Sequence, residues 1–353
     1  MALALTRPSD AAPLWLRHVQ SRVEGRLADL LELPDEERLD PRWTRALAST
    51  REYALRPGKR LRPALLAIGH GLGGGHPEYT DGLWRFAAAL ELLHTFLLVH
   101  DDVADCAERR RGSLALHHLL AEGKLGGDLA VVVGDHLFAR SVEGMLASGL
   151  PGALRAVRYL LVVCRQTAAG QYLDLDLTRT PLAEVTLPQT LRVARLKTAR
   201  YGFVAPLVAG AMLAGAPAAL LGALDRVGRR LGLAYQLRDD LLGLLGDAQV
   251  AGKSTDGDLA QGKRTFPVVA AHRRAPPSIR EEMEALWDAR RADPVVLARA
   301  RSLVTAHGGV AATERLIARA TRAARRALAS LPHGGGHLEL LDWLAASLAE
   351  RRS

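Results

Sequence analysis

Residues 91–112 read ELLHTFLLVHDDVADCAERRRG, a mostly apolar stretch that ends in three aspartates and then three arginines. On a helix, side chains four residues apart share a face, so Asp101 and Asp105 are predicted to project together, with Asp102 about 100° round the axis. Unit charges about 4 Å apart repel by about 4 kcal/mol at an effective dielectric near 20. A positive partner is therefore expected beside these carboxylates.

Mg²⁺ fits this acidic segment, because it prefers oxygen ligands and typically binds one or two carboxylates together with phosphate oxygens and water. The alternative is a solvated acidic helix end that pairs with the arginines at 109–111. A second acidic segment favours the metal: residues 235–247 read YQLRDDLLGLLGD, with Asp239 and Asp240 after an apolar stretch. Basic residues follow at 252–253 and 262–265. Together the two segments predict a cavity that holds metal-bridged phosphates, with cations neutralising the outer oxygens.

The composition predicts an all-α protein. The chain has 353 residues, 48% of them hydrophobic and only 5% aromatic, and Ala, Leu and Arg, all strong helix formers, dominate. Breaks between the helical patterns are short, and no repeat of 20–50 residues is visible. We therefore predict a flexible N-terminus at residues 1–12 and one domain at residues 13–353, built of ten or more helices.

The net charge of +9 suits an anionic partner, but most of the basic residues are interpreted as solvated helix faces, and no nucleic acid is expected. Two cysteines form neither a disulfide framework nor a metal motif, and no secretory signal is visible at the start. A cytoplasmic location is therefore predicted. Residues 205–224 are uncharged but rich in Ala and Gly, so we expect buried helices and no transmembrane segment.

The sequence contains further basic and histidine motifs at residues 58–63, 252–254 and 333–337. Lys59 and Arg62 share a face if a helix has begun at GKRLRP, residues 58–63. A nucleotide P-loop is rejected, because Asp247 stands where the first glycine of that motif belongs before Lys253. The HGGGH segment at residues 333–337 is interpreted as a loop rather than a metal site.

These motifs, in this order and spacing, resemble the trans-isoprenyl diphosphate synthase (polyprenyl synthetase) family. The resemblance runs from about residue 56 to 269. It rests on GKRLRP (58–63), ELLHTFLLVHDDVAD (91–105), RRG (110–112), GD (134–135), GQ (170–171), KTA (197–199), YQLRDD (235–240) and GK…DLAQGKRT (252–265). It implies the isoprenoid synthase fold, a single large helical bundle around a central cavity, and typically a homodimer.

The resemblance also implies the roles of the site residues. About three Mg²⁺ ions would be held by Asp101, Asp105 and Asp239, with Asp102 in support. Arg110, Lys197 and Lys253 would contact the allylic diphosphate, which Gln236 also approaches. Lys59, Arg62, His94 and Arg111 would bind isopentenyl diphosphate, and Lys263 is a further substrate-binding residue. Thr198 and Gln171 would line the region where positive charge develops.

The implied reaction is a Mg²⁺-dependent chain elongation. Diphosphate leaves the allylic carbon, the double bond of isopentenyl diphosphate attacks the cation, and a proton is lost, in the family to the released diphosphate. One departure is Gly243, which stands where the family's second DDxxD motif ends in Asp. Asp247 could reach the metal shell through water, but a role as a loop cap is favoured.

Phe96 and Leu97, five and four residues before Asp101, are predicted to set the product length. The resemblance implies that an aromatic ring at position 96 goes with a short product, geranylgeranyl diphosphate (C20), with farnesyl diphosphate (C15) as the alternative. Ordinary core packing is the simpler explanation for Phe96.

Two other functions are alternatives to chain elongation. One is a terpene cyclase, which would lack an isopentenyl site, and the other is a catalytically weak regulatory subunit, which only Gly243 supports.

Overall fold

The computed structural model describes residues 8–245, 261–289, 293–331 and 335–350. Within these ranges nearly all regular structure is helical, and the β structure is a single two-stranded hairpin, Arg109–Arg110 (β1) with Ser113–Leu114 (β2). The all-α prediction is therefore confirmed. Strong helix formers and short loops account for it. Three helices have an Asp or Thr cap and a proline as their first or second residue.

The chain divides into two compact units. Unit 1 comprises residues 1–158, 206–218 and 334–340, and unit 2 comprises residues 159–205, 219–333 and 341–353. Whether residues 13–353 act as one domain stays a prediction. Of the N-terminal segment predicted to be flexible, residues 8–12 lie in the first helix and residues 1–7 lie outside the described residues.

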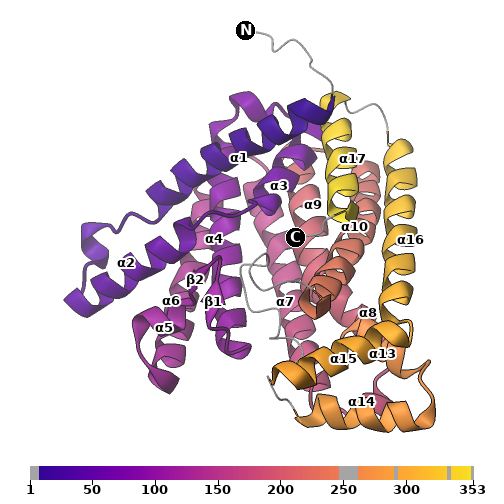
Figure 1. Ribbon diagram of the computed structural model, residues 1–353. Coiled ribbons are helices and arrows are strands. Elements are labelled where there is room, and N and C mark those ends of the chain that lie inside the picture. The colour runs from indigo at the N-terminus through magenta and orange to yellow at the C-terminus, as the bar shows by residue number, and fades with distance from the viewer. Residues whose placement is uncertain (1–7, 246–260, 290–292, 332–334, 351–353) are drawn as a thin grey trace. The chain divides into compact units, whose positions relative to one another are not determined.

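Unit 1 is built round a long apolar helix, α4 (Asp81–Ala104), which packs against α1, α3, α5 and α6. Figure 1 shows α4 and α6 side by side. The other elements of this unit are α1 (Pro8–Leu30), η1 (Asp35–Glu37), α2 (Pro41–Leu55), α3 (Leu61–Leu72), η2 (Pro77–Tyr79), α5 (Leu116–Leu120), α6 (Gly123–Leu146), the start of α7 (Ala153–Leu177), nearly all of α9 (Ala205–Leu213) and the start of α17 (Gly335–Glu350).

Helix α4 is long and apolar enough to cross a bilayer by composition alone, but 67% of that stretch is buried inside the protein. Its buried residues run almost without a break from Leu83 to Leu93. Such a helix is apolar on all sides because protein surrounds it. The prediction of buried helices at residues 205–224 is confirmed for α9, where Ala205 to Ala211 are all buried.

Unit 2 contains a second set of helices that follow one another closely along the chain. They are the rest of α7, η3 (Leu182–Glu184), α8 (Leu187–Val193), the π-helix η4 (Ala194–Val204), α10 (Ala218–Leu245), α13 (Phe266–His272), α14 (Pro277–Ala289), α15 (Pro294–Ala306), α16 (Gly309–Ala329) and the rest of α17.

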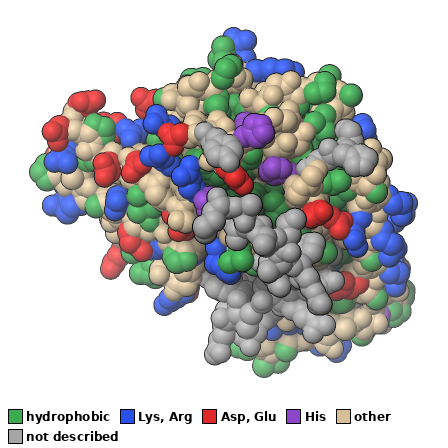
Figure 2. Space-filling view, turned by 90° about the horizontal axis from the view of Figure 1, so that it is seen from above, with side chains coloured by type: hydrophobic (Ala, Val, Ile, Leu, Met, Phe, Trp, Pro, Cys, Tyr) green, Lys and Arg blue, Asp and Glu red, His purple; other side chains and the backbone are tan. Residues whose placement is uncertain are grey.

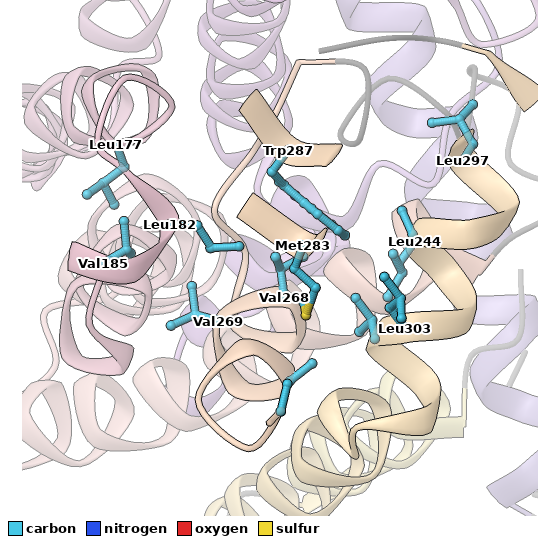
Figure 3. Close-up of a cluster of buried hydrophobic side chains, with 14 residues drawn as sticks. Leu177, Leu182, Val185, Leu244, Val268, Val269, Met283, Trp287, Leu297 and Leu303 are labelled. Atoms are coloured by element: carbon cyan, nitrogen blue, oxygen red, sulfur yellow. The ribbon is translucent and has the colours of Figure 1, made fainter. Parts of the chain in front are cut away.

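A buried hydrophobic cluster joins the helices of unit 2. Figure 3 shows Trp287 and Met283 of α14 among side chains from the neighbouring helices, including Val268 of α13 and Leu303 of α15. Trp287 is almost fully buried and donates its indole N–H to the carbonyl oxygen of Lys263, 3.3 Å away. A buried indole usually needs such an acceptor. This bond ties the 261–265 segment, which carries predicted substrate-binding residues, to the core of unit 2.

The basic surplus is spread over the surface. On the face shown in Figure 2, Lys and Arg side chains lie in several separate groups with Asp and Glu side chains between them. Many arginines pair with acidic residues one helical turn away, as Arg229 does with Asp225. This distribution agrees with the interpretation that most of the charge decorates solvated helix faces.

Candidate active site

The first acidic motif lies at the C-terminal end of α4. Asp101 is in the last turn, and Asp105 caps the helix, with its N–H donating to the carbonyl oxygen of Asp101 at 2.8 Å. The i, i+4 spacing predicted for Asp101 and Asp105 is therefore present, because a helical hydrogen bond joins the two residues. Both carboxylates are partly exposed, and the Asp101 side chain is 25% exposed. They are the two residues of this motif available to a ligand from outside.

Asp102 differs from its neighbours because it faces the interior and is fully buried. It accepts a hydrogen bond from the Tyr53 hydroxyl at 2.7 Å and is held by two guanidinium nitrogens of Arg110, with Nε at 2.8 Å. Burial and the charge of Asp102 raise the pKa of Tyr53. Burial opposes the charge of Arg110, but Asp102 outweighs it and raises the pKa of that guanidinium. Asp102 thus fixes Arg110, whose Nη2 also lies 3.6 Å from Asp101.

The predicted basic cluster at residues 109–111 forms the hairpin β1–β2. Arg111 and Gly112 occupy its two-residue turn, both with positive φ (55° and 80°), as a type I′ turn requires. Left-handed backbone costs a non-glycine residue about 1–2 kcal/mol. The side chain of Arg111 is nevertheless held firmly: it donates to the carbonyl oxygen of Arg56 at 3.1 Å and lies 3.6 Å from Glu91.

A second arginine with left-handed backbone, Arg60, lies at the start of α3 (φ 43°). It is fully buried, pairs with Glu91 at 2.9 Å, and also donates to the carbonyl oxygens of Ala54 and Arg56. Its neighbours in the GKRLRP motif differ: Lys59 is exposed and Arg62 is half-buried. The two predicted binding residues therefore flank a third basic residue that is structural.

His94 brings several predicted residues together. Burial, followed by the positive charges of Arg62, Arg111 and Arg110, holds the pKa of His94 well below its usual value. The imidazole is therefore neutral near pH 7 and able both to donate and to accept a hydrogen bond. The charges of these arginines thus reach His94, and one of them, Arg110, lies 3.6 Å from Asp101. Guanidinium groups suit a diphosphate, which they can bind with two parallel hydrogen bonds.

Phe96, predicted to set the product length, packs toward α6. Its ring lies 4.7 Å from that of His100 and 5.3 Å from that of Phe138. His100 in turn contacts the carbonyl oxygen of Val131 at 3.2 Å. A methyl group on Gly134 would lie 2.3 Å from the His100 ring, so the glycine of the GD motif is needed for this packing. Leu97 is half-buried on α4.

In unit 2 the KTA motif lies in the π-helix η4. Lys197 pairs with Asp174 of α7 at 2.7 Å, with both side chains mostly buried. Thr198 donates to the side-chain oxygen of Gln236 at 2.5 Å, and the Gln236 amide donates to Asp240 at 2.7 Å. π-Helical turns occur frequently at functional sites. Here the wider turn presents two predicted binding residues to partners on different helices.

Two glycines allow the π-helix to approach its neighbours closely. A methyl group on Gly170 of α7 would lie 2.5 Å from the backbone nitrogen of Lys197, and one on Gly232 of α10 would lie 2.5 Å from Cα of Ala199. Neither contact is possible for a larger residue without a shift of backbone. The glycine of the GQ motif therefore serves the placement of Lys197. Gln171 beside it has a buried amide nitrogen that no hydrogen bond satisfies within the described part of the chain.

The second acidic motif lies on α10. Asp239 is half-buried, whereas Asp240 is buried and accepts the bond from Gln236. Gly243, one turn after Asp239, is still within the helix, which ends at Leu245. Lys253 and Asp247 lie outside the described residues. Lys263 is half-buried in the segment before α13.

Arg264 of the GKRT motif has a structural role. Its side chain is buried, pairs with Asp288 at 2.6 Å, and donates to the carbonyl oxygens of Thr180 and Gly262. Only Lys263 of the pair at 263–264 is therefore left as a candidate for substrate binding.

A metal ion bound here would need ligands from its substrate. In the described ranges no group of three or more His, Cys, Asp or Glu residues is placed to hold a metal. Asp101 and Asp105 supply two carboxylates, while Asp102 is occupied by Arg110. Mg²⁺ fits this donor set, because it usually takes one or two carboxylates and completes its shell with phosphate oxygens and water.

Several residues that build the site were missed from the sequence. Three residues hold predicted site residues in place. Glu91 lies beside Arg111, Tyr53 donates to Asp102, and Asp174 pairs with Lys197. Glu91 carried a usable signal, because a lone carboxylate within an apolar helical stretch is rarely buried without a charged partner. Tyr53 and Asp174 carried none, since each lies in an ordinary amphipathic pattern.

A profile of the polyprenyl synthetase family matches residues 44–304. The chain belongs to this family. It is 35% identical over 227 residues to a short chain isoprenyl diphosphate synthase of Methanothermobacter thermautotrophicus, and 40% identical over 219 residues to a geranylgeranyl diphosphate synthase of Mycobacterium tuberculosis. These alignments cover 64% and 61% of this chain. They span 66% and 58% of the two relatives, which is less than two thirds of either.

Solved structures of other family members match nearly the whole chain. A geranylgeranyl pyrophosphate synthase from Corynebacterium glutamicum, complexed with isoprenyl diphosphate and magnesium, superposes with a TM-score of 0.86 at 29% identity, covering 96% of this chain and 99% of that one. A polyprenyl synthase from Caulobacter crescentus, complexed with calcium and isoprenyl diphosphate, gives 0.84 at 31% identity, covering 98% of each chain. The predictions of the family and of the isoprenoid synthase fold are confirmed.

The close approach at Gly232 gives a test of how this polyprenyl synthetase positions Lys197 and Thr198. Gly232→Ala should lower the free energy of unfolding by about 1–3 kcal/mol, because its methyl group overlaps the backbone of the π-helix. The change is measured by urea unfolding, with the binding of inorganic pyrophosphate as a second readout.

Gly222→Ala, on the same helix, is the matched control. Its methyl group would meet only the end of the Arg226 side chain at 3.6 Å, so higher helix propensity should stabilise it by up to about 1 kcal/mol. Equal effects of the two substitutions would contradict the close approach.

Proposed function

We propose that this protein is a Mg²⁺-dependent prenyltransferase that joins isopentenyl diphosphate to an allylic diphosphate and releases a short all-trans prenyl diphosphate. The observation that carries the proposal lies in unit 1, where Arg110 is held by Asp102 and lies 3.6 Å from Asp101, and the next residue, Arg111, is held by Glu91 and the carbonyl oxygen of Arg56. Relatives named as short-chain synthases support the same reaction class. A cytoplasmic location forms part of the proposal.

The residues of the chain take the following roles in the proposal. Asp101 and Asp105 would hold Mg²⁺ together with the allylic diphosphate, Asp239 would hold a further ion, and about three ions would be bound in all. Mg²⁺ held there would supply Lewis-acid stabilisation of the negative charge on the leaving diphosphate. Arg110, Lys197 and Lys253 would contact that diphosphate, near Gln236, and Thr198 and Gln171 would line the region where positive charge develops. The set that would bind isopentenyl diphosphate comprises Lys59, Arg62, His94 and Arg111, and Lys263 is a further substrate-binding residue.

The chain's fixed charges explain how ionisation becomes possible. Donors already aimed at the leaving oxygens stabilise the transition state without having to reorganise during the reaction. Arg110 meets this condition because Asp102 holds its guanidinium group. The allylic cation is then attacked by the double bond of isopentenyl diphosphate. The proton lost from the adduct goes to the released diphosphate, so no nucleophilic side chain is required.

The proposal is tested by incubating the purified protein with Mg²⁺, isopentenyl diphosphate and each allylic primer in turn. We expect a C20 product, and we expect EDTA to abolish it. Asp101→Asn should lower kcat by about a hundredfold or more, because it removes a carboxylate whose interactions matter most in the transition state. Asp128→Asn, an exposed residue of α6 paired with Lys124, is the control and should leave the rate unchanged.

The outcomes separate the alternative functions. Absence of product from every primer would favour a regulatory subunit, which Gly243 alone supports. A cyclic hydrocarbon made from a preformed long diphosphate would favour a terpene cyclase.

The product length is proposed to be C20, with C15 as the alternative. Relatives include synthases of farnesyl, geranylgeranyl and geranylfarnesyl diphosphate, so the floor of the chain cavity must distinguish them. Phe96, supported by Phe138 at 5.3 Å, is proposed as that floor, with Leu97 beside it.

Phe96→Ala should lengthen the main product by at least one five-carbon unit, because it removes the ring that would stop the growing chain. Chromatography of the dephosphorylated products measures the change. Phe86→Ala, a fully buried ring near the start of the same helix, is the control for a general loss of packing. If Phe96→Ala gave the wild-type product length, Phe96 would be an ordinary core residue.

A homodimer is proposed, with α6 supplying the contact. Leu125, Leu129 and Val132 are spaced as one face of this helix and are 59%, 40% and 57% exposed. An isologous dimer would bury the same stripe of each copy against the other, which would account for the exposed apolar row on α6.

Val132→Glu should therefore convert the dimer to a monomer, as measured by sedimentation velocity. Leu39→Glu is the matched control, since Leu39 is 80% exposed in the loop before α2. A wild-type protein that sediments as a monomer would disprove the dimer without affecting the proposed reaction.

A further inference from the structure

Two arginines with left-handed backbone meet at one carboxylate. Arg60 lies before α3 and Arg111 lies in the turn of the hairpin, 51 residues apart in the sequence, yet both guanidinium groups approach the same oxygen of Glu91, at 2.9 and 3.6 Å. These, with Cys106, are the non-glycine residues with positive φ in the described part of the chain. Strained backbone of this kind persists where surrounding contacts determine it.

Glu91 is well placed to determine both conformations. Its side chain is 2% exposed and lies near the middle of α4, the helix that also carries the first acidic motif. A buried carboxylate must be paired, because an uncompensated charge in the interior is strongly unfavourable. Arg60 supplies the close partner and is itself fully buried, so it has no freedom to reach a ligand.

Arg111 stands in a different position from Arg60. It is 19% exposed, and its second contact is a backbone carbonyl, that of Arg56. Gly58 lies against its guanidinium group, where even a methyl group would come within 3.0 Å. The side chain is thus confined between a carboxylate, a carbonyl oxygen and a bare stretch of backbone, while part of it stays accessible. Burial lowers the pKa of Arg111, and Glu91 works against this effect.

We infer that Glu91 is a positioning residue that fixes the guanidinium group of Arg111 for the diphosphate of isopentenyl diphosphate. The inference rests on the proposed function and adds a specific role to it. Glu91 plays the part for Arg111 that Asp102 plays for Arg110. The two buried carboxylates of α4 therefore position two adjacent arginines separately, one for each diphosphate substrate.

The test is the kinetics of Glu91→Gln and Glu91→Asp with each substrate varied in turn. Loss of the charged partner frees Arg111, so KM for isopentenyl diphosphate should rise about tenfold or more. KM for the allylic diphosphate, which Arg110 serves, should change by less than about twofold. Glu91→Asp keeps the charge but shortens the side chain, and should give an intermediate KM while preserving the fold. Thermal melting of each variant reports on the fold.

Glu24→Gln is the matched control. Glu24 is the other carboxylate beside Arg60, at 3.4 Å, and is 41% exposed; no ion pair joins it to Arg111 within the described residues. Its KM values should match the wild type. A merely structural Glu91 would instead affect both substrates equally and in parallel with the melting temperature, and that result would overturn the inference.

A double variant isolates the path through Arg111. In an Arg111→Ala background, Glu91→Asp should cause no further rise in KM for isopentenyl diphosphate, whereas independent effects would multiply. Multiplying effects would mean that Glu91 does not act through Arg111. Failure of the wild-type protein to consume isopentenyl diphosphate would refute the proposed function itself. The wild-type assay is therefore carried out before any variant is compared.

Discussion

The structure of unit 1 depends on the pairing of buried arginines with buried carboxylates of α4. Transferring one ion from water into a protein interior costs several kcal/mol even after relaxation. Glu91 and Asp102 each carry that cost, and each is offset by arginines that come from elsewhere in the sequence. Helix α4 is otherwise apolar and packed on most sides. Its two buried carboxylates therefore determine the positions of the segments that carry their arginine partners, the start of α3 and the hairpin.

The same helix carries two kinds of acidic residue, and their difference in burial separates their roles. Asp101 and Asp105 remain partly exposed at the end of α4, while Asp102 between them points inward. The carboxylate of Asp101, proposed to bind a ligand, and the buried carboxylate of Asp102 are thus separated by one residue step, about 100° round the helix. Unit 2 achieves the placement of its predicted binding residues by other means, since glycines there let a π-helix approach α7 and α10.

Much of this could be predicted from the sequence, because helical spacing states which side chains share a face. The i, i+4 relation of Asp101 and Asp105 followed from that periodicity, the all-α class followed from the composition, and the roles of the motifs followed from their resemblance to a known family. Periodicity does not state which distant segment covers a face, so the hold of Asp102 on Arg110 and of Asp174 on Lys197 was not foreseen. The wider turns of η4 were also unpredictable, since the glycines that permit them lie on other helices.

In the proposed reaction, the departure of a diphosphate favours arginines that are held in place over mobile ones. A flexible cation must give up rotamer freedom, about 1–2 kcal/mol for Arg or Lys, whenever it orders against a ligand. An arginine already fixed by a carboxylate has lost that freedom during folding, so more of its interaction energy remains for the transition state. The left-handed backbone of Arg111 costs about 1–2 kcal/mol, so the strain in the turn is of the same size as the rotamer freedom that a mobile cation would lose. The strain is incurred once, on folding, whereas a mobile cation would lose its freedom at every binding event.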